Sequence, residues 1–427
     1  DGVITVSATG DESNVKGMGW LNGYTTTTTN KGTINVTAAG NKTDAYGIVG
    51  DAATSMNEGT VTITHNGYGN ITGISGTQSK TGVLVINDNR TTGDSASNIG
   101  GKEFVYGLSI GTGRDHYGKI TINSNLSATI TYGIYGAGTN YGDVLLNLNR
   151  TDANKGTLDL SESGRSDYTN FSVMRSTSVN TIKNYGNLKA TLQNTADDYS
   201  GYLVNLYGIY RYGGNGDVQN YGTISLDKQA VNNSAFVAGV RIDSANFLNG
   251  CDDEKCGKIN ITSVGQGNVR GVMFATVNPV KQIVNEKGAE ISVIKSKHAN
   301  STGSTIGIID AFLGRENSVF NVINKGSIIA ENHGTGNSIG FYVDYDFITQ
   351  ASKFVNDETG TITVSASGGG DAYGIYVKAK KYGSDVAYID VVNKGTIIVN
   401  ATNDDNKGYN AGQAYGIYAT GRDTRVY

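Results

Sequence analysis

The sequence of 427 residues predicts an all-β fold, because three short patterns with strand periodicity recur together along it. The first is Asn-x-Gly-Thr-Ile-x-Val, the second is Tyr-Gly-Ile-Tyr or a variant, and the third is an apolar stretch before many of the Asn-x-Gly turns. Only one Pro stands beside 60 Gly. This scarcity agrees with an all-β chain, because Pro cannot donate an N–H to a neighbouring strand. The uniform composition predicts repetition of one unit rather than several different domains.

The first pattern predicts one half-buried strand in each repeat. The second and fourth residues after its glycine are apolar in nearly every copy, whereas the third is mostly Thr, Asn, Ser, Asp or Lys. Such alternation with a period of two places one face of a strand in a core and the other in solvent. The thirteen copies, about 33 residues apart, are at Gly2, Gly32, Gly59, Gly82, Gly118, Gly156, Gly186, Gly222, Gly257, Gly288, Gly326, Gly360 and Gly395.

The second and third patterns predict two more strands in each repeat. The residue after the glycine of the second pattern is always apolar, in the copies Tyr46–Val49, Tyr106–Ser109, Tyr132–Tyr135, Tyr207–Tyr210, Ile339–Tyr342, Tyr373–Tyr376 and Tyr415–Tyr418. The third pattern is clearest at Val319–Ile323, Lys353–Val355 and Ala387–Val392.

Three strands per repeat with an Asn-x-Gly corner are typical of a right-handed parallel β-helix, here of about 13 rungs. We expect Asn and Gly at the corner because both tolerate left-handed backbone angles, and we expect stacked Asn side chains to hydrogen-bond along the axis. No linker divides the chain. Residues 1–427 are therefore predicted to form a single elongated domain, about 60 Å long at ~4.8 Å per rung.

Composition excludes several classes of function. Charged residues make up 17% of the chain and its net charge is −4, so no nucleic-acid partner is expected. No apolar run approaches the roughly 20 residues of a membrane-spanning helix, and the first residues lack the features of a signal peptide, so we expect a chain that is already processed. Nothing in the sequence predicts a cofactor or a metal site.

The two cysteines, Cys251 and Cys256, enclose only four residues. No other Cys and no nearby His is present to complete a metal site. We predict a disulfide-closed loop in an oxidising compartment, with two free thiols as the alternative.

The repeated Asn-x-Gly-x-Ile and Gly-Ile-Tyr patterns, the few Pro and charged residues and the close Cys pair resemble the passenger domain of a Gram-negative type V autotransporter. The resemblance covers essentially the whole chain. It implies export through the periplasm, passage of the outer membrane through a C-terminal β-barrel translocator that this chain lacks, and display at the cell surface or release. A stack of rungs that template one another suits folding outside the cell, where no ATP is available. The narrow Cys loop suits such export as well.

Candidate catalytic groups are few. Gly93–Ala96 resembles the nucleophile motif of protease passengers, but it lies between two predicted rungs and is interpreted as a polar loop. The histidines are scattered and are predicted to lie on the surface: His65, His116, His298 and His333. A carbohydrate-active enzyme needs converging carboxylates, and the outward column offers only Asp159 beside Lys189. The sequence therefore predicts no catalytic residue and no enzyme.

Two features are candidates for ligand binding. Tyr342, Tyr376 and Tyr418 follow the Gly-Ile pair in successive rungs, and they are expected to form an aromatic ladder about 5 Å apart that stacks on sugars or protein side chains. The alternative is that the ladder only stabilises the sheet. The second feature is the acidic tip of the Cys loop, formed by Asp252, Asp253 and Glu254, which either meets a basic partner or is a solubilising turn. A short basic group, Lys378, Lys380 and Lys381, is a weaker candidate for glycosaminoglycan binding.

The leading hypothesis is a non-enzymatic adhesin at the bacterial cell surface or secreted. Its expected partners are host glycans, extracellular-matrix proteins or copies of itself on neighbouring cells. A toxin or effector passenger that acts on host cells is the second hypothesis, and a carbohydrate-active β-helix enzyme is the third. Simple observations distinguish these classes. Clumping or adhesion of cells indicates an adhesin, intoxication of cultured cells indicates a toxin, and a cleft lined by carboxylates indicates an enzyme.

Overall fold

The computed structural model describes most of the chain. The described residues are 2–10, 13–19, 28–40, 43–51, 54–67, 69–89, 104–124, 130–150, 169–194, 204–213, 216–231, 236–243, 245–274, 281–298, 300–310, 320–345, 351–379, 388–402, 412–421 and 424–427. Regular structure within these ranges consists of β-strands, and they include no helix long and apolar enough to span a lipid bilayer.

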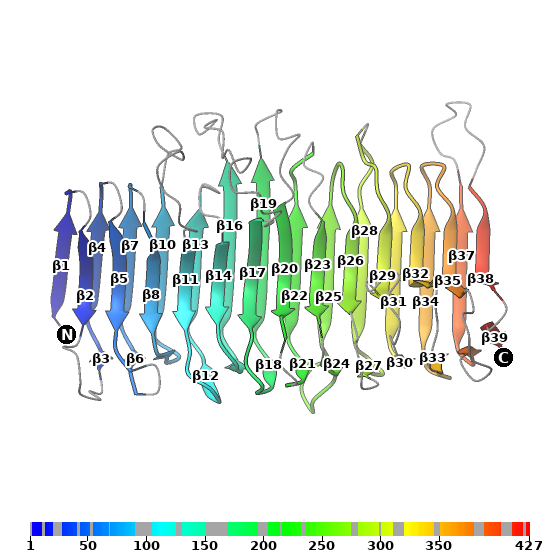
Figure 1. Cartoon of the computed structure of the whole chain (residues 1–427), viewed down its shortest axis with the longest axis horizontal. Helices are drawn as coiled ribbons and strands as arrows, with labels where there is room; N and C mark the ends of the chain where they lie inside the picture. Colours follow the sequence, from blue (N-terminus) through cyan, green and yellow to red (C-terminus); the bar gives the residue numbers. More distant parts are fainter. Residues whose placement is uncertain are drawn as a thin grey trace. The chain divides into compact units, whose positions relative to one another are not determined.

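Three parallel sheets of 13 strands each make up the fold, and consecutive strands of the chain pass through the sheets in rotation (Figure 1). Sheet A contains β1 (Val3–Ala8), β4 (Thr33–Ala38), β7 (Thr60–His65), β10 (Val83–Asp88), β13 (Lys119–Ser124), β16 (Asp143–Arg150), β19 (Asn187–Asn194), β22 (Thr223–Lys228), β25 (Lys258–Ser263), β28 (Glu290–Lys295), β31 (Ser327–Asn332), β34 (Thr361–Ala366) and β37 (Thr396–Ala401).

Sheet B contains the Gly-Ile pattern. Its strands are β2 (Asn14–Gly19), β5 (Asp44–Val49), β8 (Ile71–Ser75), β11 (Phe104–Ser109), β14 (Ile130–Tyr135), β17 (Thr169–Ser176), β20 (Val204–Arg211), β23 (Val237–Ile242), β26 (Val269–Phe274), β29 (Thr305–Asp310), β32 (Ser338–Tyr345), β35 (Ala372–Ala379) and β38 (Ala414–Thr420).

Sheet C contains short strands that lead into the Asn-x-Gly corners. They are β3 (Thr29–Asn30), β6 (Met56–Asn57), β9 (Thr77–Gln78), β12 (Arg114–His116), β15 (Gly138–Asn140), β18 (Ile182–Asn184), β21 (Val218–Asn220), β24 (Phe247–Asn249), β27 (Lys281–Asn285), β30 (Phe320–Asn324), β33 (Ser352–Asn356), β36 (Ile389–Asn393) and β39 (Thr424–Val426). One strand from each sheet completes a rung, which confirms the predicted parallel β-helix of 13 rungs with three strands each.

Two compact units contain these rungs. Unit 1 comprises Asp1–Ser176 and Gly186–Gly208, and unit 2 comprises Thr177–Tyr185 and Ile209–Tyr427. In unit 1 the second and fourth residues of β4 and β7 are fully or almost fully buried, as Ile34, Val36, Val61 and Ile63. In unit 2 the same positions of β31 and β34 are buried as well. The apolar columns that the sequence predicted therefore form the core of each unit.

The glycine of the Gly-Ile pattern lies where a strand of sheet B passes close to the side chains of sheet A. A Cβ atom on Gly307 would lie 2.4 Å from Ile328 Cγ2, and one on Gly47 would lie 2.6 Å from Val61 Cγ1. The same atoms would also lie 2.6 Å and 2.4 Å from the carbonyl oxygens of Gly340 and Gly73, respectively. No side chain fits there, because such separations are far below van der Waals contact.

The sheet C strands from β3 to β33 end in a buried polar residue, and from β18 to β36 in unit 2 these end residues form a continuous ladder. Each Asn donates through Nδ2 to Oδ1 of the Asn in the next rung, at 2.8–2.9 Å. The members are Asn184, Asn220, Asn249, Asn285, Asn324, Asn356 and Asn393. The predicted stacking of Asn side chains is confirmed.

The reason proposed for glycine in the Asn-x-Gly corner was wrong. Gly32, Gly59 and Gly395 are not among the glycines with positive φ angles. A Cβ on them would instead lie 2.0–2.2 Å from the carbonyl oxygen of the preceding rung. Corner glycine is thus required by close packing of backbone on backbone rather than by a left-handed conformation.

Two copies of the first pattern were assigned incorrectly. The copy at Gly156 lies outside the described residues, and the sixth strand of sheet A is β16, which follows Gly142 and pairs with β13 and β19. Its outward position holds Leu145, so the alternation that marks other copies is weak there. In the tenth rung, Lys258 pairs with Glu290, so Ala289 rather than Gly288 occupies the position equivalent to Gly257.

Candidate binding surfaces

The predicted aromatic ladder is present on sheet B of unit 2. The ring centroids of Tyr342 and Tyr376 are 5.1 Å apart, and those of Tyr376 and Tyr418 are 5.0 Å apart, in stacked arrangements. A second pair, Tyr373 and Tyr415, stacks at 5.2 Å and meets the first ladder edge to face. The sequence predicted the spacing correctly because β32, β35 and β38 pair in register.

The tyrosine hydroxyl groups in this surface interact with acidic side chains. Tyr373 Oη donates to Asp371 Oδ2 at 2.8 Å, and Tyr342 Oη donates to Asp344 Oδ2 at 3.4 Å. Asp344 also pairs with Lys378, with Nζ 3.1 Å from Oδ1. Burial, and then the negative charge of Asp344, raise the pKa of Tyr342 to about 12, so its hydroxyl stays protonated at neutral pH.

This packing limits what the ladder can bind. In a stacked ladder each inner ring covers the face of its neighbour, so Tyr376 has both faces occupied by Tyr342 and Tyr418. Sugars stack on a free ring face, whereas this ladder offers mainly ring edges. Mutual stacking stabilises the sheet, and the predicted ligand-binding role of these tyrosines stays a prediction.

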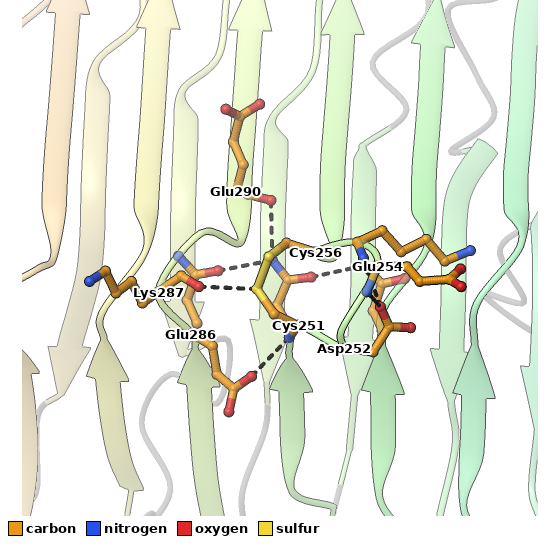
Figure 2. The surroundings of a disulfide bond; sticks show 11 residues. Cys251, Asp252, Glu254, Cys256, Glu286, Lys287 and Glu290 are labelled. Carbon is orange, nitrogen blue, oxygen red and sulfur yellow. Dashed lines mark hydrogen bonds between the residues drawn. A yellow bond between two sulfur atoms is a disulfide. The ribbon is translucent and has the colours of Figure 1, made fainter.

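The disulfide loop of unit 2 has the predicted bond between Cys251 and Cys256, with an S–S distance of 1.99 Å (Figure 2). The loop is anchored to the next rung, since the backbone N–H of Cys251 donates to Glu286 Oε2 at 2.9 Å. Gly288 lies against the sulfur atoms, and a Cβ there would lie 2.9 Å from Cys256 Sγ. The bond thus closes a corner loop that rests on the adjacent rung.

The three acidic residues of this loop have different roles. Asp252 Oδ1 accepts hydrogen bonds from the backbone N–H groups of Glu254 and Lys255, at 2.9 and 2.7 Å. These bonds lower the pKa of Asp252 and make it a turn-forming residue. Asp253 and Glu254 are exposed. Asp252 is exposed as well, so a basic partner can reach all three residues of the predicted acidic tip, and that partner stays a prediction.

The prediction that all four histidines lie on the surface was wrong for two of them. His65 and His116 are fully buried at the ends of β7 and β12. His65 Nε2 lies 2.6 Å from the carbonyl oxygen of Thr43. His298 is exposed, and His333 is half-buried beside Ser367. Polar residues at the ends of these strands can point inward, which an isolated His in a sequence does not reveal.

Several other candidate residues lie outside the described part of the chain. These are Gly93–Ala96, Asp159, Lys380 and Lys381. Lys189 lies on β19 and is exposed. The described residues contain no group of three or more His, Cys, Asp or Glu arranged to hold a metal ion.

Unit 2 also buries two lysines that sequence reasoning missed, Lys228 and Lys295 at the ends of β22 and β28. Their ammonium groups donate to backbone carbonyl oxygens: Lys228 to Gln266, and Lys295 to Gly267 and Thr302. Burial lowers the pKa of Lys228 to about 7 and that of Lys295 to about 8. These carbonyl groups compensate the buried cations only in part.

The corner ladder of unit 1 has an irregularity that bounds an open pocket. Asn30 donates to Asn57 at 2.8 Å, but the next two positions hold Gln78 and His116 instead of Asn. Beside them lies a pocket of about 440 Å³, lined by Met56, Thr77, Gln78, Ser79, Lys80, Gly113, Arg114, Asp115 and Tyr117. The only sign of it in the sequence is that these two repeats depart from the Asn-x-Gly pattern.

Comparison of this chain with protein-family models, with curated proteins and with solved structures found no match. The described strands define a parallel β-solenoid, a fold that does not by itself determine a function.

Proposed function

We propose that this chain is a non-enzymatic adhesin, exported as an autotransporter passenger and displayed at the surface of a Gram-negative cell. Three properties support this placement. A parallel β-solenoid can fold rung by rung as it emerges, because each new rung is templated by the one before. The Cys251–Cys256 disulfide fits an oxidising compartment, and its loop is narrow.

The observation that carries the proposal is the outward face of sheet A in unit 1. Along β4, β7 and β13 the first, third and fifth residues face outward between buried neighbours. Apart from Lys119 they are uncharged hydrogen-bonding residues, namely Thr33, Asn35, Thr37, Thr60, Thr62, Thr64, Thr121 and Asn123. We call these eight residues the polar face. The strand between β7 and β13, β10, has Val83, Val85 and Asn87 at the same outward positions.

The polar face is suited to binding a second copy of itself. Hydroxyl and amide groups both donate and accept hydrogen bonds, so two identical faces can be complementary without charge repulsion. Parallel pairing brings the Thr and Asn side chains into register, as with Asn35 opposite Thr62 and Thr37 opposite Thr64. Each hydrogen bond contributes about 1 kcal/mol at best, but many copies on two cells act together. Cell-to-cell self-association is the function that this geometry supports best.

The proposal is tested by displaying the chain through an outer-membrane barrel on non-clumping cells and measuring how fast the suspension settles. Cells that carry the parent chain should settle, and the triple variant Asn35→Lys/Thr62→Lys/Thr121→Lys should settle as slowly as cells with the barrel alone, because like charges then face each other. The matched control places three lysines on sheet B of unit 1, as Thr72→Lys/Ser75→Lys/Ser109→Lys, and should still settle.

Parent cells that stay dispersed would contradict self-association, as would equal settling of the two triple variants. Host glycans and matrix proteins are the other expected partners of an adhesin. Dispersed cells that nevertheless bind immobilised matrix protein or glycan would replace self-association with host adhesion. Cells that do neither would overturn the adhesin proposal as a whole.

A further inference from the structure

The pocket in unit 1 results from an interruption of sheet C. β6 pairs with β9 at two positions, and β12 pairs with β15 at three. Between β9 and β12 the register contains a single pair, Gln78 with His116. The two strands therefore separate before this pair, and the pocket of about 440 Å³ lies where they do.

The turn after β9 extends the wall of this pocket. Asn30 and Gly32 are separated by one residue, whereas Gln78 and Gly82 are separated by three, Ser79, Lys80 and Thr81. The longer turn is ordered: the Gly82 N–H donates to the Ser79 carbonyl at 3.1 Å, and Thr81 Oγ1 donates to the Glu58 carbonyl at 2.8 Å. It places the exposed Lys80 at the pocket, which Arg114, the first residue of β12, also lines.

The lining combines three kinds of chemistry. Lys80 and Arg114 are exposed cations with no ion pair within the part of the chain that the structure describes. Asp115 is a half-buried acceptor that binds the Tyr117 hydroxyl at 3.3 Å. Met56 and Tyr117, each 38% exposed, supply apolar surface.

Gln78 forms the innermost wall, since it is only 1% exposed. Its Nε2 donates to the Lys119 carbonyl at 3.0 Å, which assigns the amide orientation. Its Oε1 is buried and has no hydrogen-bond partner among the described residues. Because this oxygen has almost no accessible surface, Gln78 is a buried floor of the pocket rather than a group that contacts a ligand.

We propose that this pocket binds a carboxylated sugar, such as a hexuronic acid unit of an acidic glycan. A carboxylate matches the planar guanidinium of Arg114 and the ammonium of Lys80. Sugar hydroxyls supply donors to Asp115, and the apolar face of the ring covers Met56 or Tyr117. A neutral sugar leaves both cations unmatched, and a simple anion lacks the donors. The volume lies within the range of small-ligand sites, roughly 300–1,000 Å³.

This inference does not rest on self-association, because the pocket belongs to sheet C and the polar face to sheet A. The test uses the full chain, purified, with methyl glucuronide as the probe and ligand-observed NMR as the readout. We expect saturable binding with a dissociation constant on the order of 1 mM, as is usual for a single weakly held ligand of about −4 kcal/mol. Methyl glucoside and glucose 6-sulfate, at the same concentration, should bind at least ten times more weakly.

Two charge-matched double variants locate the site. Lys80→Gln/Arg114→Gln should weaken binding of methyl glucuronide more than tenfold. Lys325→Gln/Lys394→Gln removes two exposed corner lysines of unit 2 and should leave binding unchanged. All four residues are exposed, so both variants are expected to keep the parent melting temperature.

Three results would overturn the inference. The first is no binding of methyl glucuronide at 10 mM, roughly ten times the expected dissociation constant. The second is an equal loss of binding in the two double variants, which would indicate a general charge effect. The third is binding of glucose 6-sulfate as strong as that of methyl glucuronide, which would indicate recognition of any anion rather than of a carboxylate.

Discussion

At the scale of single residues, most repeat positions with glycine have no room for a side chain. This lack of room, rather than a special backbone angle, is why glycine is required there. The corner glycines lie on the carbonyl groups of the preceding rung, and the sheet B glycines before β38 lie against Ile, Val or Leu side chains of sheet A. Glycine thus occurs where the backbone approaches the same rung or the neighbouring rung most closely. This explains why 60 Gly occur in a chain whose strands otherwise favour β-branched residues.

Gly307→Ala should destabilise unit 2, because its methyl group would lie 2.4 Å from Ile328 Cγ2. Overpacking of this kind costs about 1–3 kcal/mol. Gly416→Ala is the matched control: it occupies the same position in β38, and a Cβ there meets nothing within 4 Å. Urea denaturation should show a loss for Gly307→Ala and a change within about 0.5 kcal/mol for Gly416→Ala. Equal effects of the two substitutions would contradict the spatial explanation.

At the scale of elements, the corner ladder links one short strand of sheet C to the next. Strands of two or three residues contribute little pairing by themselves, and buried amide groups that bond to each other along the stack add to it. The ladder of unit 1 is weaker at β12. His116 is fully buried, and neither of its ring nitrogens has a partner among the described residues.

His116 should make unit 1 sensitive to acid. Burial lowers its pKa from 6.5 to about 4, although Asp143 opposes this shift. Between these values the unfolded chain binds a proton and the folded chain does not, so stability falls as pH drops through this window. From pH 8 to pH 5 the expected loss is about 2 kcal/mol. Melting temperatures measured across this range should fall less steeply for His116→Asn.

The control for this prediction is His298→Asn, which changes an exposed His and should follow the parent curve. His116→Asn also restores the residue that most corners contain, so at pH 5 the variant should be the more stable protein. Parallel pH curves for the parent chain and His116→Asn would show that His116 does not titrate as its burial requires.

At the scale of the whole molecule, a solenoid transmits little stability over distance, because each rung contacts mainly its neighbours. We therefore expect local effects within each unit. Gly47→Ala should raise amide hydrogen exchange in β2, β5 and β8 of unit 1 and leave β32 and β35 of unit 2 unchanged. Gly340→Ala, whose Cβ would lie 2.5 Å from the Gly374 carbonyl oxygen, should do the reverse. Mass spectrometry of peptides resolves the two regions, and exchange raised throughout the chain by either substitution would mean cooperative unfolding instead.

The sequence by itself determined the β-helix, its three strands per rung, the tyrosine spacing and the Cys pair. Each is a local or periodic property: an apolar column in Ile34 and Val61, or two cysteines with four residues between them, can be recognised without knowledge of distant contacts. Only the tertiary structure decided that β16 is the sixth rung, that His65 and His116 are buried, and that β9 and β12 separate around a pocket. These depend on which residues stack across rungs, and insertions of varying length hide that pairing wherever a repeat departs from its pattern.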